Sequence, residues 1–318
     1  MDISIIIVNF YSAAFLRRCL ESVAAQTSRP LNVLIINNGD VEGAMNFVAD
    51  TYPDYRVVEQ ANIGFAAGNN LAINLLADCE WVALLNPDAF PEPDWLENLV
   101  QSAQDHPDAD VFSSQMLQEN DPQILDGRGD CYHISGLAWR AEHGKKDIRS
   151  SNYSEVFSAC GAAAMFRRAV LLEVGGFDEN FFCYFEDVDL GFRLRLRGFR
   201  CIHASRAVVK HIGSACSGGE KSDFALYHGH RNLVWTFVKN MPGLLFWALL
   251  PLHILLNVAE IFWFSLHGRG KIICRAKLDA IKRLPSVWLQ RQQVQRLRTI
   301  SSSSILKLMS LWPLAGGR

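Results

Sequence analysis

The stretch Trp81-Val82-Ala83-Leu84-Leu85-Asn86-Pro87-Asp88 decides the fold of this chain. Its first five residues are apolar, which predicts a strand buried on both faces, and Asn86-Pro87-Asp88 then ends the strand with a carboxylate. In an open α/β sheet, ligands bind beyond the carboxyl ends of the strands. A carboxylate at that edge can hold a divalent cation. Asn-Pro-Asp is also common in turns, so an ordinary turn remains an alternative.

The first hundred residues alternate between strand and helix patterns. Apolar runs predict further strands at 3–8, 33–36 and 56–58, and helical spacing predicts helices at 14–25, 43–49, 66–76 and 94–104. This alternation predicts an α/β fold with a mostly parallel sheet flanked by helices. Asn9-Phe10-Tyr11-Ser12 follows the first strand where a dinucleotide-binding enzyme would carry its glycine fingerprint, which disfavours a dehydrogenase.

The middle of the chain changes character twice. Residues 120–155 are polar and rich in glycine, which predicts a mobile loop or a hairpin beside the site. Residues 157–167 predict another strand, whose small residues at 159–164 would let a ligand or another backbone approach closely.

Cysteine usage and the first residues indicate the compartment. The eight cysteines are scattered without a Cys-x-x-Cys pair, as expected for buried free thiols in a reducing compartment, and this disfavours a zinc site. Met1-Asp2 leads directly into the first predicted strand without a signal peptide. We therefore expect the body of the protein to be cytoplasmic.

The charges divide the chain into two regions. Residues 241–318 hold 11 of the 31 Lys and Arg but only two of the 33 Asp and Glu. A basic and apolar tail on an acidic body fits an anionic membrane surface, whereas nucleic-acid binding would require a reading motif that the sequence lacks. We predict an α/β domain at 1–240 and a helical, membrane-associating region at 241–318.

The apolar part of this tail allows three structures. Residues 242–259 contain no Asp, Glu, Lys or Arg, a length at the lower limit for a bilayer span, and His253, Asn257 and Glu260 would be costly in hydrocarbon. We favour a membrane-associated hairpin or interfacial helix over a true span or a buried soluble helix. The basic residues beyond, with Trp288 among them, predict an amphipathic helix in the headgroup layer, or else a solvated helical tail.

Five motifs together resemble a known family. In chain order they are Ser4–Phe10, Asn62–Asn70, Leu85–Asp88, Gly175–Glu179 and Glu186–Leu190. Over about residues 3–240 the chain is similar to family 2 of the inverting glycosyltransferases, especially its rhamnosyltransferase-like bacterial members. The resemblance implies a GT-A fold (the Rossmann-like fold of nucleotide-diphospho-sugar transferases), a donor sugar linked to dTDP, UDP or GDP, and a divalent cation, Mg²⁺ or Mn²⁺.

Inverting transfer requires help for the leaving diphosphate and a base for the acceptor hydroxyl. Asp88 is the expected metal ligand, and Asn86 stands where many relatives carry another Asp. His211, placed after a strand as in the family, is the second candidate ligand, with a hydrogen-bonded structural histidine as the alternative.

The carboxylates of Glu186-Asp187-Val188-Asp189 begin a predicted helix, whose N-terminus stabilises anions, while neighbouring carboxylates raise a pKa. Asp187 is the candidate general base, with Glu186 beside it, and simple helix-start acids are the alternative. The aromatic residues before them, including Tyr184 and Phe185, suit either an acceptor-sugar pocket or the core.

The donor is expected at a loop-to-helix junction and at strand ends. Glycine permits close approach there, and backbone N–H groups and amides can hold a nucleotide. Asn37 stands where relatives usually carry an Asp that contacts the base, which leaves the choice of nucleotide open. The candidate donor-binding residues are Asn9, Asn37, Asn38, Asn62, Gly64, Phe65, Gly68, Asn69, Asn86 and Asp88.

Our leading hypothesis is a metal-dependent inverting glycosyltransferase, peripheral or monotopic at the cytoplasmic face of the inner membrane. It would transfer a sugar, rhamnose by resemblance, to a lipid-linked or cell-surface polysaccharide acceptor. The alternative is a non-catalytic sugar-nucleotide-binding subunit of a membrane-bound polysaccharide assembly complex, suggested by the amides at positions 37 and 86.

Overall fold

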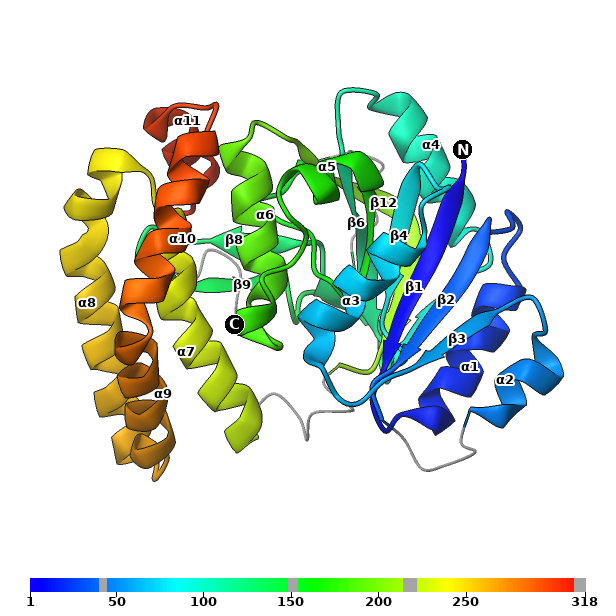
Figure 1. The fold of residues 1–318 in the computed structure, drawn as a ribbon, viewed down its shortest axis with the longest axis horizontal. Helices are drawn as coiled ribbons and strands as arrows, with labels where there is room; N and C mark the ends of the chain where they lie inside the picture. Colours follow the sequence, from blue (N-terminus) through cyan, green and yellow to red (C-terminus); the bar gives the residue numbers. More distant parts are fainter. Residues whose placement is uncertain (40–44, 148–153, 214–221, 312–318) are drawn as a thin grey trace.

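A computed structural model describes residues 1–39, 45–147, 154–213 and 222–311. A ten-stranded sheet forms its centre, in the order β10-β12-β6-β11-β4-β1-β2-β3, with β5 added to β12 and β7 to β6 (Figure 1). The strands are β1 (Ile3–Asn9), β2 (Asn32–Asn37), β3 (Arg56–Glu59), β4 (Trp81–Leu85), β5 (Ala89–Pro91), β6 (Val111–Gln118), β7 (Asp121–Gly127), β10 (Ser154–Glu155), β11 (Ala163–Arg167) and β12 (Cys201–His211).

The sheet is mixed. Strands β3, β2, β1 and β4 pair in parallel, as the alternating pattern predicts. Strand β11 lies antiparallel between β4 and β6. A parallel pair needs a long crossover, usually a helix, and the described residues between β6 and β11 form only short strands and loops. Strands β5, β7 and β10 also pair antiparallel with their neighbours, so antiparallel pairing is not confined to β11.

Helices cover both faces of the sheet, as the α/β prediction requires. The first core, with Ile5 and Ile7, is covered by α1 (Ala13–Ala24), α2 (Asn46–Thr51) and α4 (Trp95–Asp105). The second, with Ile6 and Val8, is covered by α3 (Gly64–Leu75), α5 (Arg168–Glu173) and α6 (Glu186–Leu196). Alternate side chains of β1 thus enter opposite cores, and all seven are buried, which explains why the strand is apolar on both faces from Ile5 to Val8.

The predicted strands at 3–8, 33–36, 56–58 and 81–85 are confirmed, as are the helices at 14–25, 66–76 and 94–104 within two residues at each end. Part of the predicted helix at 43–49 lies outside the described residues. The predicted strand at 157–167 is half right: β11 starts at Ala163, and residues 157–162 are buried without being a strand. Residues 120–155 contain β7 and a hairpin of β8 (Asp130–Tyr132) and β9 (Ala138–Arg140).

A helical bundle packs beside the sheet domain (Figure 1). It contains α7 (Asp223–Asn240), α8 (Gly243–Leu266), α9 (Gly270–Lys282), α10 (Leu284–Leu297) and α11 (Ser302–Leu308). A third core joins α6 and α7 to the later helices through buried residues such as Phe192, Phe237 and Val287. The predicted boundary at 240 falls between α7 and α8, within one shared core.

Helix α8 directs its polar side chains toward the protein and its apolar side chains outward, the reverse of a surface helix in a soluble protein. Among the described residues it is the one helix long and apolar enough to cross a membrane. Its polar side chains face the protein: His253 contacts the Ser135 carbonyl oxygen at 2.7 Å, and Glu260 pairs with Lys277 at 2.7 Å. Its outer face is apolar, with Leu255 and Phe262 exposed by 63% and 66%. The polar groups that would be costly in hydrocarbon are therefore covered by protein.

Candidate active site

His211 lies between two aspartates at the edge of the sheet. Its Nε2 is 3.4 Å from Oδ1 of Asp88, and its Nδ1 is 2.7 Å from Oδ2 of Asp126. The contact forms because β5 pairs antiparallel with β12, which places Ala89 opposite His211. All three side chains are buried. The structure thus joins the two predicted metal ligands and adds a third residue, Asp126, behind the imidazole.

This arrangement suits a divalent cation. Histidine ligands in metal sites usually donate their second ring N–H to a carboxylate, which fixes the tautomer, and Asp126 occupies that position. Nε2 of His211 is buried and makes no hydrogen bond with the described residues, so it is available as a ligand beside the Asp88 carboxylate. The described residues hold no group of three or more His, Cys, Asp and Glu arranged for a metal, so a cation here would also need ligands from the substrate.

The same contacts determine the titration of His211. Burial lowers its pKa, but the hydrogen bond to Asp126, the close contact with Asp88 and the charges of both carboxylates outweigh burial and raise the pKa above its ordinary 6.5. Arg140 balances Asp126 from the other side at 2.6 Å. Metal binding would have to displace a proton from His211.

The predicted asparagines form a row along the carboxyl ends of β1, β2 and β3. Asn9 donates to Oδ1 of Asn37 at 2.8 Å, and Asn37 donates to Glu59 at 2.7 Å. Asn38 donates to the Gly64 carbonyl oxygen at 2.9 Å, and its Oδ1 is buried without a hydrogen-bond partner among the described residues. That oxygen can accept a hydrogen bond from a ligand. Glu59 thus places a negative charge beside Asn37, the position at which relatives usually carry an Asp.

Two glycines bring α3 close to its neighbours. Gly64 has φ +86°, and its N–H donates to Oδ1 of Asn62 at 3.0 Å. A Cβ at Gly68 would lie 3.0 Å from Cγ1 of Val8 and 3.3 Å from Nδ2 of Asn38. Gly68 therefore lets α3 approach β1 and the asparagine row, which is a packing role.

Two candidates on α3 make their contacts within the protein. Asn69 is buried and donates to the Phe65 carbonyl oxygen one turn earlier, at 2.9 Å. The Phe65 ring packs edge-on against Phe177, with centroids 6.2 Å apart, and lies beside Gly161. These contacts explain both residues structurally, and their donor-binding role remains a prediction.

Asp187 lies at the same sheet edge as Asp88. Oδ2 of Asp187 accepts a hydrogen bond from the Gly161 N–H at 3.0 Å. The next residue, Ala162, accepts from the Asn86 N–H at 2.8 Å at the end of β4. The irregular small-residue stretch before β11 thus connects the candidate base to the strand end that carries Asp88. The close approach predicted for these small residues is with Asp187 itself.

Glu186 and Asp130 add carboxyl groups beside Asp187. Burial, and then the charge of Asp187, raises the pKa of Glu186 well above its ordinary value, and the same two causes raise the pKa of Asp130. Oε2 of Glu186 is buried without a hydrogen-bond partner among the described residues. Asp130 accepts from Ser158 at 3.1 Å. Burial therefore favours neutral carboxyl groups around the half-buried Asp187.

The loop before Asp187 has an unusual backbone. Phe182, Tyr184 and Phe185 have φ of +68°, +63° and +66°, a region that costs non-glycine residues free energy. Asn232 on α7, fully buried, donates to the carbonyl oxygens of three loop residues, Phe181, Cys183 and Tyr184, at 2.7 to 3.1 Å. Phe185 packs against the third core and the Tyr184 ring lies 6.3 Å from that of Phe224. Their acceptor role remains a prediction.

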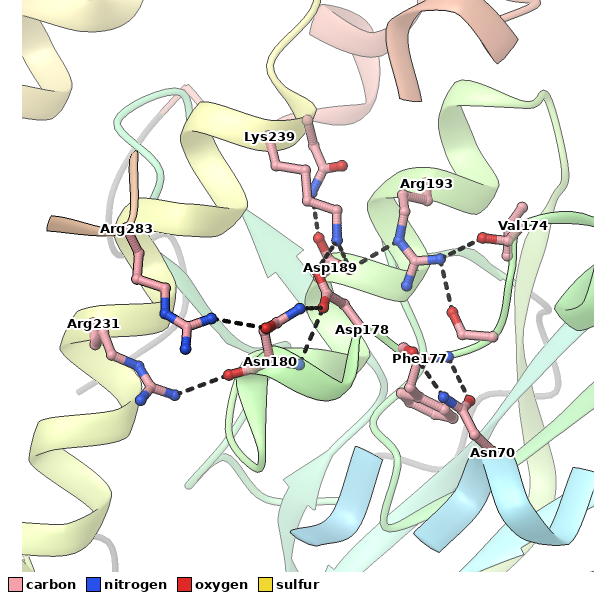
Figure 2. Close-up of polar contacts among 12 residues, drawn as sticks. Asn70, Val174, Phe177, Asp178, Asn180, Asp189, Arg193, Arg231, Lys239 and Arg283 are labelled. Atoms are coloured by element: carbon pink, nitrogen blue, oxygen red, sulfur yellow. Dashed lines mark hydrogen bonds and ion pairs between the residues drawn. The ribbon is translucent and has the colours of Figure 1, made fainter. Parts of the chain in front are cut away.

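Asp189, the last carboxylate of this cluster, points away from the site into a buried ionic network (Figure 2). It is fully buried and binds Arg193 at 2.8 Å, Lys239 at 2.9 Å and Asn240 at 2.7 Å. Lys239 also binds Asp178 at 2.7 Å. The network ties the Gly175–Glu179 motif, α6 and α7 together, so part of the acidic motif is structural.

Sequence reasoning missed Asp126, Asp130 and Asn232. The two aspartates lie in the glycine-rich segment predicted beside the site, so their position was indicated but their roles were not. The contacts of Asn232 depend on the packing of α7 on a loop fifty residues earlier, which no local pattern encodes.

The family of the chain follows from its sequence. The model of the family described as "Glycosyl transferase family 2" matches residues 4–175, which is more than half of the 318 residues. The chain belongs to glycosyl transferase family 2. The predicted family is confirmed, and with it glycosyltransferase activity.

Named relatives support the rhamnosyltransferase-like part of this prediction. The N-acetylglucosaminyl-diphospho-decaprenol L-rhamnosyltransferase of Mycobacterium tuberculosis is 26% identical over 247 residues, which cover 70% of this chain and 80% of the relative. The O-antigen chain rhamnosyltransferase RfbN of Salmonella typhimurium is 23% identical over 214 residues, which cover 66% of each chain.

Solved structures confirm the GT-A fold. GalNAc-T7, crystallised with UDP, GalNAc and Mn²⁺, superposes with a TM-score of 0.60 at 13% identity over 75% of this chain and 48% of its own. The mannosyltransferase PcManGT of Pyrobaculum calidifontis, in complex with GDP-Man and Mn²⁺, superposes with a TM-score of 0.55 at 17% identity over 96% and 86%. At these identities the likeness concerns the fold alone.

Proposed function

We propose that this glycosyltransferase moves a rhamnosyl group, with inversion, from a nucleotide diphosphate to a saccharide on a lipid carrier. The two relatives named as rhamnosyltransferases support the sugar, and the diphospho-decaprenol in one of their names supports a lipid-linked acceptor. The observation that carries the proposal is the connection of Asp187, through Gly161 and Ala162, to the strand end that bears Asn86 and Asp88.

In this reaction the acceptor hydroxyl oxygen bonds to the anomeric carbon of the donor. The bond from that carbon to the diphosphate oxygen breaks, and the nucleoside diphosphate leaves. Asp187 accepts the hydroxyl proton as general base. The Gly161 N–H orients its carboxylate, and burial of Glu186 and Asp130 favours neutral groups around it. The row of Asn9, Asn37 and Asn38 holds the nucleotide at the adjacent strand ends.

Asp88 and His211 would hold the divalent cation, Mg²⁺ or Mn²⁺. When bound, it neutralises charge on the leaving diphosphate, whose oxygens supply the further ligands. The buried Nε2 of His211 beside Asp88 and the presence of Mn²⁺ in both similar solved structures support this proposal. Asp126 fixes the imidazole so that Nε2 faces Asp88.

The apolar outer face of α8 supports attachment to a membrane surface, which we propose is the cytoplasmic face of the inner membrane. Its polar side chains are occupied by α7, α9 and the β8–β9 hairpin, so the helix cannot expose apolar groups on all sides as a span would. We propose that α8 lies in the membrane surface as a monotopic element. A lipid-linked acceptor would then reach the enzyme from the same surface.

The test combines Asp187→Asn with a surface control, Asp223→Asn, at an exposed carboxylate on α7. With dTDP-rhamnose, Mn²⁺ and a membrane lipid extract, Asp187→Asn should lower acceptor-dependent release of nucleoside diphosphate about 10²- to 10⁴-fold. Its affinity for the nucleoside diphosphate, measured by calorimetry, should stay within about twofold, because the base contributes to the transition state more than to binding. The control should behave as the wild type.

Two results would contradict the proposal. Near-normal turnover of Asp187→Asn would remove the base assignment. Wild-type protein that binds nucleotide sugars but releases no product with any donor or lipid extract would favour the non-catalytic subunit.

A further inference from the structure

A groove lies between the first turns of α8 and the second half of α10, apart from the site at the sheet edge. Its volume is about 510 Å³, and Leu244, Trp247, Trp288, Arg291 and Arg298 contribute to its lining. The two indole rings lie 6.3 Å apart, and both remain accessible, Trp247 by 60% and Trp288 by 38%. The groove therefore has an apolar and aromatic wall on α8, with Leu244 and Trp247, and a second wall on α10 and the residue after it that carries Trp288 and two arginines.

The cations of this groove have no carboxylate counterion. Among the described residues neither Arg291 nor Arg298 forms a salt bridge with Asp or Glu. Nη1 of Arg291 donates to the Val238 and Met241 carbonyl oxygens at 2.8 and 2.5 Å, which fixes the guanidinium at the end of α7. Arg298 donates to Ser302 at 2.8 Å. Burial, and then the charge of Arg298, lowers the pKa of Arg291 to about 10. Two adjacent, oriented cations favour an anion between them.

The groove continues into the apolar outer face of α8. Leu244, at the groove, is 86% exposed, and further along the helix Val258, Phe262 and Trp263 are 57 to 66% exposed. Tryptophan and arginine beside an apolar surface are typical of the headgroup level of a bilayer. An occupant that matches both walls has a phosphate at one end and hydrocarbon at the other.

The groove is remote from the diphosphate of the reaction. Arg291 contacts α7 at Met241, nine residues beyond Asn232, which holds the loop before Asp187. That spacing corresponds to about 14 Å along the helix axis. The lining of the groove also contains none of the candidate donor-binding, metal or catalytic residues, so an anion in the groove is separate from a donor diphosphate bound at Asp88.

We propose that this groove binds the phosphate of an anionic membrane phospholipid, with Arg291 and Arg298 on the phosphate and the acyl chains along Trp247 and the outer face of α8. The proposal rests on the membrane attachment proposed above and adds a choice of lipid to it. It predicts that the enzyme prefers membrane regions rich in anionic lipid, because the site lacks a counterion of its own.

Full-length protein would be sedimented with vesicles of phosphatidylcholine alone and with phosphatidylglycerol added. Arg298→Gln should weaken binding to the anionic vesicles about fivefold and leave binding to neutral vesicles unchanged. Arg296→Gln is the matched control, because Arg296 is an exposed arginine of α10 outside the groove, and it should change binding less than twofold. Trp247→Ser should weaken binding to both kinds of vesicle.

The outcomes separate the groove from the proposed function. Equal losses of vesicle binding in Arg298→Gln and Arg296→Gln would show diffuse attraction between positive charge and the membrane, and no specific groove. Release of the protein from anionic vesicles by inorganic phosphate at constant ionic strength would show that the site binds free phosphate. A raised KM of Arg298→Gln for a detergent-dissolved lipid-linked acceptor would assign the groove to the acceptor. Failure of the wild type to bind any vesicle would overturn membrane attachment itself, whereas transfer activity in detergent tests the chemistry alone.

Discussion

The backbone of Gly64 lies directly against Phe182. A Cβ at Gly64 would be 2.6 Å from Cδ2 of the Phe182 ring and 2.8 Å from the Phe182 carbonyl oxygen. The same carbonyl oxygen accepts a hydrogen bond from the Ala66 N–H at 3.2 Å. Gly64 begins the helix predicted to hold the donor, and Phe182 belongs to the loop that leads into Asp187. The two motifs, more than a hundred residues apart in sequence, therefore depend on each other for their position.

Gly64→Ala should disturb both motifs, because the substitution adds a clash to an unfavourable φ. Gly144→Ala is the matched control, since Gly144 has φ +77° and no described atom lies within 4 Å of its Cβ position. The control should lower the free energy of unfolding by about 1 kcal/mol. Gly64→Ala should cost more and lower turnover at least about tenfold, as measured by urea unfolding and product release. Equal effects of the two substitutions would show that the contact with Phe182 is unimportant.

Asn232→Ala should reduce kcat with little change in the donor KM. It removes the donor to three carbonyl oxygens of the strained loop, at a cost of about 1–3 kcal/mol in unfolding free energy, and leaves the positive φ values without their support. Asn240→Ala is the control, because Asn240 is another fully buried amide of α7 but donates to Asp189. We expect both variants to lose stability and only Asn232→Ala to lose kcat, about tenfold or more. A comparable fall in kcat for Asn240→Ala would reduce Asn232 to a general structural role.

The affinity for Mn²⁺ in the presence of nucleoside diphosphate should fall as pH is lowered through the raised pKa of His211, because the ligand must be neutral. Without metal the sign is opposite. The stability that protonated His211 contributes is complete below 6.5 and is lost as pH rises through the folded-state pKa. Asp126→Asn should move both transitions to lower pH. Calorimetric titration and urea unfolding at several pH values would measure them, and unchanged profiles in Asp126→Asn would exclude His211 as the titrating group.

The network in Figure 2 predicts acid sensitivity. Although burial opposes it, Lys239 and Asn180 lower the pKa of Asp178 from 3.8 to about 2. Asp178 therefore contributes stability above pH 3.8, about 2 kcal/mol in full, which is lost as pH falls toward 2. Lys239→Met should greatly weaken this dependence, because only Asn180 then lowers the pKa of Asp178 against burial, and it should cost about 3–5 kcal/mol at neutral pH by leaving carboxylates unpaired.

Urea unfolding between pH 2 and neutrality would measure both effects of Lys239→Met. Asp178→Asn separates them, since it should abolish the acid dependence at a smaller cost in stability. Acid dependence that persists in both variants would place its origin elsewhere.

Much of the fold was predictable because its signals are local. The runs that start at Ile5, Val33 and Trp81 are apolar without interruption because both faces of these strands are covered, and the polar residues that follow them mark one sheet edge. The direction of β11 was not predictable, because it depends on which partners flank the strand. The sequence around Gly161 did not indicate that this residue lies outside the strand, where its N–H contacts Asp187.

The candidate site was predictable as a set of motifs and less so as a set of contacts. Asp88 and His211 were paired by the resemblance to the family, and the structure brings them together. Asp126 reaches His211 because β7 pairs with β6 and β6 pairs with the distant β12, and Glu59 lies beside Asn37 because β3 pairs with β2. The pairings of β12 with β6 and of β3 with β2 are non-local. The inward direction of Glu260 could not be inferred either, because its partner Lys277 belongs to the following helix.

Helix α7 has a practical consequence for preparing this enzyme. One side of α7 contacts the loop before Asp187 through Asn232. Its other side shares a core with Ala280, Val287 and Ile305 of the last helices. Truncation after Asn240 would remove the later helices from that core, expose the apolar side of α7 and yield an insoluble fragment. If α8 attaches the enzyme to the membrane as proposed, a detergent-free form would keep every helix and exchange outward residues such as Phe262 and Trp263 for hydrophilic ones.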